Sequence, residues 1–272
     1  MLEIERHEGG VALVTLSAEA SRNAFSVESI TAISMTLDAL LDDPEVRGFV
    51  LTGSGEVFCS GADIGSFADA IDAGSIGDMV QALTGVLHPL LLRMRASSTV
   101  YVAAINGAAA GGGLGLALSA DYRVALPSAR LAAAFFSLGL SPDGGTTWLL
   151  PRLVGDQAAK RFFFENEVWD GRTALQKGAV DELVEGDGRD DLTDRALEVA
   201  RLWSRWAEMS RRSTKQLLDA QSNTFFETQL EFERALITAS SLTPDFAEGV
   251  SAFLEKRRPD FVRHAESLPE EE

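Results

Sequence analysis

The spacing of apolar residues predicts strands and helices that alternate through the first two thirds of the chain. Two short runs, LEIER at 2–6 and VALVTL at 11–16, flank the turn HEGG and predict a β-hairpin. Apolar residues three and four apart then predict an amphipathic helix that begins after Ser26, as its N-cap, and ends before Pro44. The same spacing predicts a second helix over 76–96.

Short, nearly continuous apolar runs predict buried strands between these helices. They are VRGFVLTG at 46–53, TVYVAAI at 99–105, and the pair YRVAL and RLAAAF around 122–135. Strands that alternate with helices up to about residue 180 indicate an α/β core with parallel strands. After residue 190 the pattern changes to helices alone, over 191–207, 211–221, 225–241 and 244–257. We therefore expect a core over 1–190 and a C-terminal helical region over 191–272.

Composition and charge exclude some classes of binding partner for this chain. The 272 residues carry a formal net charge of −17, which argues against broad nucleic-acid binding and against docking on anionic lipid. No uncharged apolar run is long enough to span a membrane, so no membrane partner is expected. The opening MLEIERHEGG is charged at once and does not read as a signal peptide.

The sequence offers few metal or redox ligands. Cys59 is the single cysteine, so no intrachain disulfide is possible and a cytoplasmic location is the default expectation. His7, His88 and His264 are scattered, and no Cys/His cluster has metal-ligand spacing, so we expect no metal site. Each histidine is interpreted as a solvated or packed side chain.

The stretch AAGGGLGL at 109–116 holds three consecutive glycines after a buried strand. It lacks the order of a dinucleotide fingerprint, and the chain has no Walker-type motif. One interpretation is tight packing alone. The other is that glycines at a helix start let backbone N–H groups point at an oxyanion. A second such turn, with Gly61, Ala62 and Asp63, lies in VFCSGADIGSF at 57–67, so two segments could each give one donor.

Six motifs in order carry a family resemblance: RNAFS (22–26), FCSGADI (58–64), INGAAAGGGLGLALSADYRVA (105–125), FSLGLSPDGGTTWLLPRLVG (136–155), GAVDELV (178–184) and EGVSAFLEKRRPDF (248–261). Over nearly its whole length the chain resembles the crotonase, or enoyl-CoA hydratase/isomerase, superfamily. The resemblance implies an α/β fold, a spiral of ββα units with a C-terminal helical subdomain. It also implies a coenzyme A thioester as substrate rather than a bound cofactor, and a homotrimer or dimer of trimers formed through the C-terminal region.

By motif position the resemblance implies roles for individual residues. The backbone N–H groups of Ala62 and Gly112 would form the oxyanion hole for the thioester carbonyl. Coenzyme A would be bound by a set drawn from both turns and the C-terminal helix: Arg22, Asn23, Ala24, Asp63, Ile64 and Lys256. Lys256 would reach from a neighbouring subunit, or it would only complement the C-terminus of its own helix.

The chain departs from the hydratase pattern at both usual acids. Gly115 and Phe135 stand where the resemblance places the two hydratase glutamates, and neither can move a proton. Asp143, in SPDGG, stands where some isomerases of the family carry a catalytic aspartate, although it could instead cap the helix that follows. Phe135, Phe136 and Trp148 are candidates for an acyl pocket and are equally at home in a core.

The leading expectation is therefore an enoyl-CoA isomerase that uses Asp143 as the proton carrier. Two alternatives remain open at this point. One is an acyl-CoA-binding protein without catalysis, which kept the glycine turns and lost the acids. The other is an enoyl-CoA hydratase that recruits atypical acids.

Overall fold

The strands form two sheets, and the chain passes from one sheet to the other as it advances. The computed structural model describes residues 2–18, 22–185, 188–221 and 224–261. The larger sheet has the order β1 (Leu2–His7), β2 (Val11–Leu16), β3 (Gly48–Gly53), β5 (Val100–Ile105), β7 (Tyr122–Ala125), β10 (Glu182–Leu183). The smaller sheet has the order β4 (Val57–Cys59), β6 (Ala108–Ala110), β8 (Arg130–Ala132), β9 (Val168–Asp170). From β3 to β8 successive strands belong to alternate sheets, which gives a spiral of repeated units.

Strand direction follows the sequence prediction. β1 and β2 form the predicted antiparallel hairpin, with Leu2 opposite Leu16 and His7 opposite Val11. The other neighbours in the larger sheet pair in parallel, as expected for strands joined by helical crossovers. In the smaller sheet only β9 runs antiparallel, against β8.

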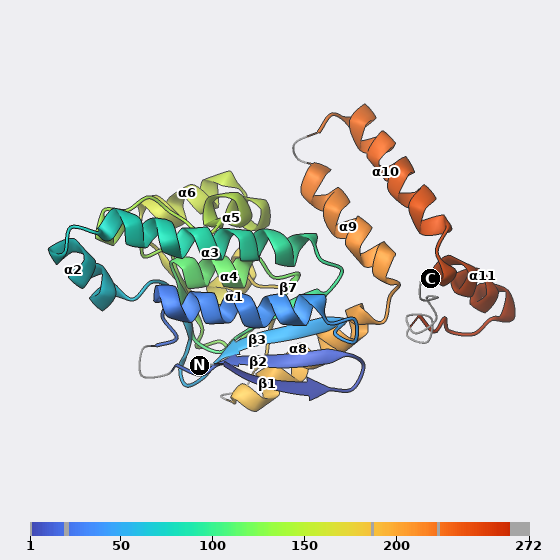
Figure 1. The fold of residues 1–272 in the computed structure, drawn as a ribbon, viewed down its shortest axis with the longest axis horizontal. Helices are drawn as coiled ribbons and strands as arrows, with labels where there is room; N and C mark the ends of the chain where they lie inside the picture. The colour runs from blue at the N-terminus through green and yellow to red at the C-terminus, as the bar shows by residue number, and fades with distance from the viewer. Residues whose placement is uncertain (1, 19–21, 186–187, 222–223, 262–272) are drawn as a thin grey trace, which may run out of the picture.

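Both faces of β2, β3 and β5 in the larger sheet are covered, which explains why these three strands are apolar almost throughout. Ala12, Val14 and Leu16 of β2 belong to the core cluster that packs under α1 (Val27–Asp42) and α3 (Ile76–Ala96). Val11 and Leu13 belong instead to the cluster formed with α8 (Arg189–Ser204). Figure 1 shows α1 and α3 running side by side above β3, with α8 behind the hairpin.

Capping residues set the bounds of the best predicted helix. Ser26 is the N-cap of α1, and its side chain accepts a hydrogen bond from the Ser29 amide while the Ser29 hydroxyl accepts from Ser26. The helix ends at Asp42, just before Asp43 turns extended ahead of Pro44. In the described part of the chain, five further α-helices connect the strands: α2 (Ile64–Asp72), α4 (Gly112–Leu118), α5 (Thr146–Val154), α6 (Asp156–Phe164) and α7 (Gly171–Lys177).

The four helices predicted after residue 190 are present, but they do not form one body. α8 packs on the sheet through Leu192, Ala196 and Leu197, so it lies with the core. α9 (Glu208–Ala220), α10 (Phe226–Ser241) and α11 (Pro244–Glu255) extend away from the core as an arm in Figure 1. The predicted division of the chain after residue 190 stays a prediction, and the visible change of direction falls after α8.

Ionic contacts fasten the base of the arm to the core. The Lys215 ammonium on α9 lies 2.9 Å from a carboxylate oxygen of Asp121, and it also donates to the carbonyls of Met94 and Thr99. Arg211 is buried, and burial lowers the pKa of its guanidinium to about 10. Its guanidinium donates to backbone carbonyls on both sides of the junction. These contacts orient the start of the arm.

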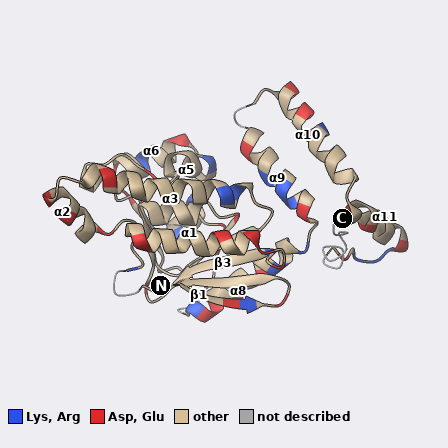
Figure 2. Ribbon diagram, in the orientation of Figure 1, with Lys and Arg blue, Asp and Glu red and all other residues tan. Residues whose placement is uncertain are grey.

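Charged residues lie mainly on the outer helices and on β1. In Figure 2 acidic and basic positions are interspersed along these helices, whereas β2 and β3 carry no charge. Within the described residues, no helix is both long and apolar enough to cross a membrane.

Candidate active site

The two turns predicted to give oxyanion donors lie against each other. Gly61 and Gly111 both have positive φ, +84° and +53°, a conformation that favours glycine. A Cβ at Gly61 would lie 2.7 Å from the Ala110 carbonyl oxygen and 3.2 Å from the Gly112 nitrogen. Only a residue without a side chain allows this approach, so the glycines bring the turn before Ala62 next to the start of α4.

The amides of Ala62 and Gly112 have no acceptor among the described residues. Gly112 is the first residue of α4, where backbone N–H groups lack partners within the helix. Both residues are partly exposed, so a ligand can reach them. Two unused donors on adjacent segments are what a polarised carbonyl oxygen requires. The structure thus brings together the pair that the sequence suggested.

The RNA turn at residues 22–24 lies beside the first of these donors. The Phe25 amide donates to the Gly61 carbonyl at 2.7 Å, and the Asp63 amide donates to the Phe25 carbonyl at 2.9 Å. These bonds form a short parallel bridge between Phe25 and Ala62. Five of the six candidate coenzyme A residues therefore lie on two connected turns.

Those candidates differ in what their side chains can offer. Asn23 is 2% exposed. Its side-chain amide accepts a hydrogen bond from the Ala18 backbone amide and donates to the carbonyls of Val57 and Phe58. It therefore shapes the turn, which leaves its backbone rather than its side chain for a ligand. The side chain of Asp63 is similarly occupied, since it caps α2 and accepts from Ser66.

Arg22 and Ile64 are exposed beside these two residues, and Ala24 is half-buried. Lys256 is exposed and ends α11 in the left-handed conformation, with φ +56°. In Figure 1 α11 and α2 lie at opposite ends of the molecule. Lys256 therefore cannot meet the two turns of its own chain, and a role in binding would require another copy.

Gly115 packs directly under the turn that carries Asp143. A Cβ at Gly115 would lie 2.1 Å from the Gly144 carbonyl oxygen, and one at Gly144 would lie 3.4 Å from the Cα of Gly112. The 143–145 turn therefore fills the space into which a side chain at residue 115 would project. Gly144 follows Asp143 directly in the sequence, so its contact with Gly112 also places the Asp143 backbone close to the second oxyanion donor.

The Asp143 carboxylate does not cap the helix that follows. The N-cap of α5 is Gly145, and it is the Asp143 carbonyl that accepts from the Thr146 amide and hydroxyl. The carboxylate instead contacts His88, with 2.6 Å between Asp143 Oδ1 and His88 Nε2. The two side chains are 36% and 48% exposed. The capping interpretation of Asp143 is therefore wrong for its side chain.

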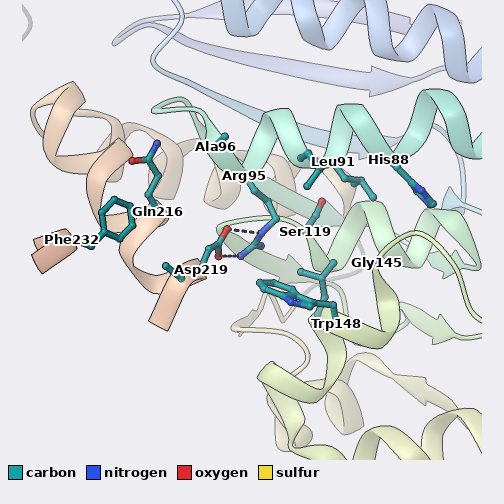
Figure 3. A pocket seen from close by; sticks show the side chains of 13 residues that line it. His88, Leu91, Arg95, Ala96, Ser119, Gly145, Trp148, Gln216, Asp219 and Phe232 are labelled. Carbon is teal, nitrogen blue, oxygen red and sulfur yellow. Dashed lines mark hydrogen bonds and ion pairs between the residues drawn. The ribbon is translucent and has the colours of Figure 1, made fainter. Parts of the chain in front are cut away.

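A largely apolar pocket of about 780 Å³ begins at His88 and Gly145. Leu91, Trp148 and Leu149 also line it, and Figure 3 shows Phe232 of the arm at the end opposite His88. Ala62 and Gly112 do not line it. Asp143 adjoins both regions, because its carboxylate contacts His88 while the next residue, Gly144, contacts Gly112.

Of the three candidate acyl-pocket residues, Trp148 alone lines this pocket. The guanidinium carbons of Arg152 and Arg95 lie 3.5 Å and 5.0 Å from the Trp148 ring centroid. Arg95 also pairs with Asp219 of α9 across the pocket, as Figure 3 shows. Phe135 is buried in the core, and Phe136 is exposed and packs edge-on against Phe164.

His88 is the residue that sequence reasoning missed. It lies next to Leu87 on α3, outside the buried stripe of that helix, so the apolar pattern marks it as a surface position. No local motif connects residue 88 with residue 143. Only the packing of α3 against α4 and the 143–145 turn brings the two together.

Comparisons with known proteins agree with this fold. The enoyl-CoA hydratase/isomerase family model matches residues 6–264. The 1,2-epoxyphenylacetyl-CoA isomerase of Escherichia coli K12 is 32% identical, over 94% of this chain and 96% of its own. The 2,3-dehydroadipyl-CoA hydratase of the same organism is also 32% identical, over 92% and 94%.

A solved structure of an enoyl-CoA hydratase from Polaromonas sp. JS666 superposes with a TM-score of 0.85 at 30% identity, covering 95% of this chain and 98% of its own. The chain belongs to the enoyl-CoA hydratase/isomerase family, within the crotonase superfamily. The predicted fold class, a spiral of ββα units followed by helices, is confirmed. Relatives of similar identity carry both isomerase and hydratase names, so the family alone does not select the reaction.

Proposed function

We propose that this protein is an enoyl-CoA isomerase that shifts a C=C bond along an acyl-CoA thioester, with Asp143 as the proton carrier. The observation that carries the proposal is the position of the Asp143 carboxylate. It is not used as a helix cap, and Gly144 holds its backbone against Gly112 at the start of α4. One carboxylate beside an oxyanion hole is sufficient for moving a proton within one substrate.

The reaction is balanced without a cofactor. The Asp143 carboxylate removes a proton from the α-carbon of a 3-enoyl thioester, and the electron pair of that C–H bond delocalises into the carbonyl and the neighbouring C=C bond. The oxygen of the resulting dienolate accepts hydrogen bonds from the Ala62 and Gly112 amides, which can each contribute about 3 kcal/mol to stabilising the developing charge. Asp143 then returns the proton to the γ-carbon, which gives the conjugated 2-enoyl thioester and restores the charge of the carboxylate.

The same geometry disfavours the ordinary hydratase mechanism. Water addition needs acids to activate the water and to protonate the α-carbon. A glutamate at residue 115 would collide with Gly144, and Phe135 is apolar and buried. We place the acyl chain in the apolar pocket beside Trp148, and the coenzyme A moiety at Arg22, Ala24 and Ile64 on the connected turns.

Apart from the substrate, the partners that we propose are further copies of this chain, which together form a homo-oligomer. The arm exposes a run of large apolar side chains: Phe225, Leu230, Ile237, Leu242, Phe246, Val250, Phe253 and Leu254. Soluble monomers rarely leave so much apolar surface uncovered. Homotrimers, or dimers of trimers, would cover it and could bring Lys256 to a neighbouring coenzyme A site. A cytoplasmic location stays a prediction.

Turnover of 3-enoyl-CoA by purified protein tests the reaction, followed through the ultraviolet absorbance of the conjugated product. Asp143→Asn should lower kcat about 10³-fold, because it removes the base. Calorimetric binding of acyl-CoA should be unchanged, and Asp190→Asn on the exposed face of α8 serves as the matched control.

Full activity of Asp143→Asn would refute the assignment of Asp143. Hydration of crotonyl-CoA by the wild type, without isomerisation, would favour a hydratase with atypical acids. Acyl-CoA binding with no turnover across a panel of enoyl-CoA chain lengths would favour the binding protein without catalysis.

A further inference from the structure

His88 lies on α3, 55 residues before Asp143 in the sequence, and contacts it through one carboxylate oxygen. The distance from His88 Nε2 to Asp143 Oδ1 is 2.6 Å, a direct hydrogen-bonded contact in which the tautomer of the imidazole decides whether Nε2 donates. The contact uses Oδ1, and within the described residues Oδ2 has no hydrogen-bond partner. The carboxylate is therefore held by one oxygen while the other remains available.

The contact is poorly suited to a stabilising role. Both side chains are partly exposed, and exposed ion pairs contribute little to the stability of a fold. The turn that carries Asp143 is already held by other contacts. The Asp143 carbonyl accepts two hydrogen bonds from Thr146, and Gly144 packs on α4. These backbone contacts do not determine the direction of the Asp143 carboxylate. The contact with His88 does.

The helical turn that carries His88 is itself part of the candidate site. A Cβ at Gly112 would lie 3.3 Å from Cδ2 of Leu87, the residue before His88. His88 also lines the largely apolar pocket, together with Gly145 and Leu91. The helix α3 thus sets the position of His88 relative to both the oxyanion donor and the proposed acyl site.

We propose that His88 is a positioning residue for Asp143 in the proposed isomerase reaction, on which this inference rests. A neutral imidazole with its proton on Nε2 donates to Oδ1 and directs Oδ2 toward the substrate carbons. During turnover the migrating proton is carried on Oδ2, and the Nε2 proton stays on His88 throughout. His88 therefore changes the rate by orienting the base and adds no proton of its own.

Three variants separate this role from a merely structural one. His88→Leu removes the donor and keeps an apolar side chain, so kcat should fall about 10- to 100-fold, the effect of a misplaced catalytic group, while KM stays within about twofold. His88→Gln keeps an N–H donor of similar reach and should recover most of kcat. Gln81→Leu, two turns earlier on the exposed side of α3, is the matched control and should be as active as the wild type.

The double variant His88→Leu/Asp143→Asn provides the decisive measurement. If His88 acts through Asp143, His88→Leu should lower kcat no further once Asp143 is replaced. The inference is overturned if His88→Leu keeps the wild-type kcat, if it changes KM alone, or if its effect persists in the Asp143→Asn background. These outcomes leave the proposed function intact as long as Asp143→Asn lowers kcat about 10³-fold. A fully active Asp143→Asn would overturn both.

Discussion

Gly115 and Gly144 pack backbone against backbone, and a Cβ at residue 115 would overlap the Gly144 carbonyl oxygen at 2.1 Å. This contact relates the two ways in which the chain departs from a hydratase. Residue 115, where the family resemblance places one hydratase glutamate, is a glycine, and the turn that carries Asp143 occupies the space into which a side chain there would project. The absence of an acid at residue 115 and the placement of Asp143 therefore both follow from one packing contact, between Gly115 and Gly144.

Gly115→Ala should separate α4 from the 143–145 turn. The added methyl forces overpacking against backbone, which typically costs about 1–3 kcal/mol of unfolding free energy. Isomerase turnover should fall as well, because Asp143 moves with the turn. The measurement is urea unfolding together with kcat.

Gly85→Ala on α3 is the matched control for this change. A Cβ at Gly85 meets no atom within 4 Å, so alanine should instead stabilise the helix by about 0.5–1 kcal/mol. Gly115→Glu should not produce a hydratase, because the carboxylate has no space to enter the site. Wild-type stability of Gly115→Ala would contradict the close packing described here.

Asn23→Ala should destabilise the turn beside the oxyanion hole. The Asn23 side chain accepts from the Ala18 amide at 3.0 Å and donates to the Val57 carbonyl at 2.8 Å, inside the protein. Loss of these buried bonds should lower the unfolding free energy by about 2–3 kcal/mol and weaken coenzyme A binding measured by calorimetry.

Asn166→Ala controls for the backbone part of that effect. Asn23 and Asn166 both have a left-handed backbone, with φ of +54° and +50°, but Asn166 is exposed. Alanine at either position meets the same conformational penalty, and at residue 23 alone it also removes buried hydrogen bonds. Equal losses for the two variants would show that the side chain of Asn23 contributes nothing to the turn.

Cys59 should make the fold less stable as pH rises above 9. Burial raises the pKa of its thiol from the usual 9.0 to about 12, so the folded protein keeps a proton that the unfolded chain releases. Stability from this group is complete below pH 9 and is lost as pH approaches 12, at about 1.4 kcal/mol for each pH unit.

Cys59→Ser should flatten that slope while keeping a donor to the Asn23 carbonyl, which the thiol contacts at 3.1 Å. Denaturant unfolding between pH 9 and 10 makes the comparison before Tyr101, whose pKa burial also raises, begins to contribute. The native thiol should also resist alkylation at pH 8, since it stays protonated. An unchanged slope in Cys59→Ser would assign the pH dependence to other groups.

Local patterns in the sequence were sufficient to predict the helices and strands. The positions of the candidate site residues could be found only from the family resemblance and from the packing in the structure. Ser26 and Pro44 delimit α1 because capping and proline geometry act within a few residues. The two glycine turns were candidates for donors because glycines at a helix start leave backbone N–H groups unobstructed, and tight packing was the alternative interpretation. That they touch each other depends on the pairing of β4 with β6 in the smaller sheet, which brings Gly61 and Gly112 together and which no local pattern contains.

The residues that sequence reasoning placed least well are those whose roles depend on distant partners. His88 looks like a surface position on α3, and its partner lies on a different element. Phe135 and Phe136 are adjacent, but one is in the core and the other is exposed at the start of a short 3₁₀ turn. The direction of α9–α11 away from the core also follows from single contacts, such as Lys215 with Asp121, rather than from apolar spacing.

The last prediction concerns self-association of the chain through the arm, α9–α11. Phe253 and Leu254 on α11 are 83% and 74% exposed in the single chain. If copies cover this surface, light scattering on the eluting wild-type protein should give the mass of three chains or of six, and Phe253→Asp/Leu254→Asp should give a smaller species. Charges at these positions would have to be buried without partners, which the interface cannot tolerate.

Met35→Asp controls for the added charge, since Met35 is 68% exposed on α1 and lies outside the arm. That variant should keep the wild-type mass. If Lys256 binds coenzyme A on a neighbouring copy, the arm variant should also bind acyl-CoA more weakly although Ala62, Gly112 and Asp143 are unchanged. A wild-type protein that elutes with the mass of one chain at the same concentration would exclude the arm as a surface for self-association, and Lys256 would then act only at the end of its own helix.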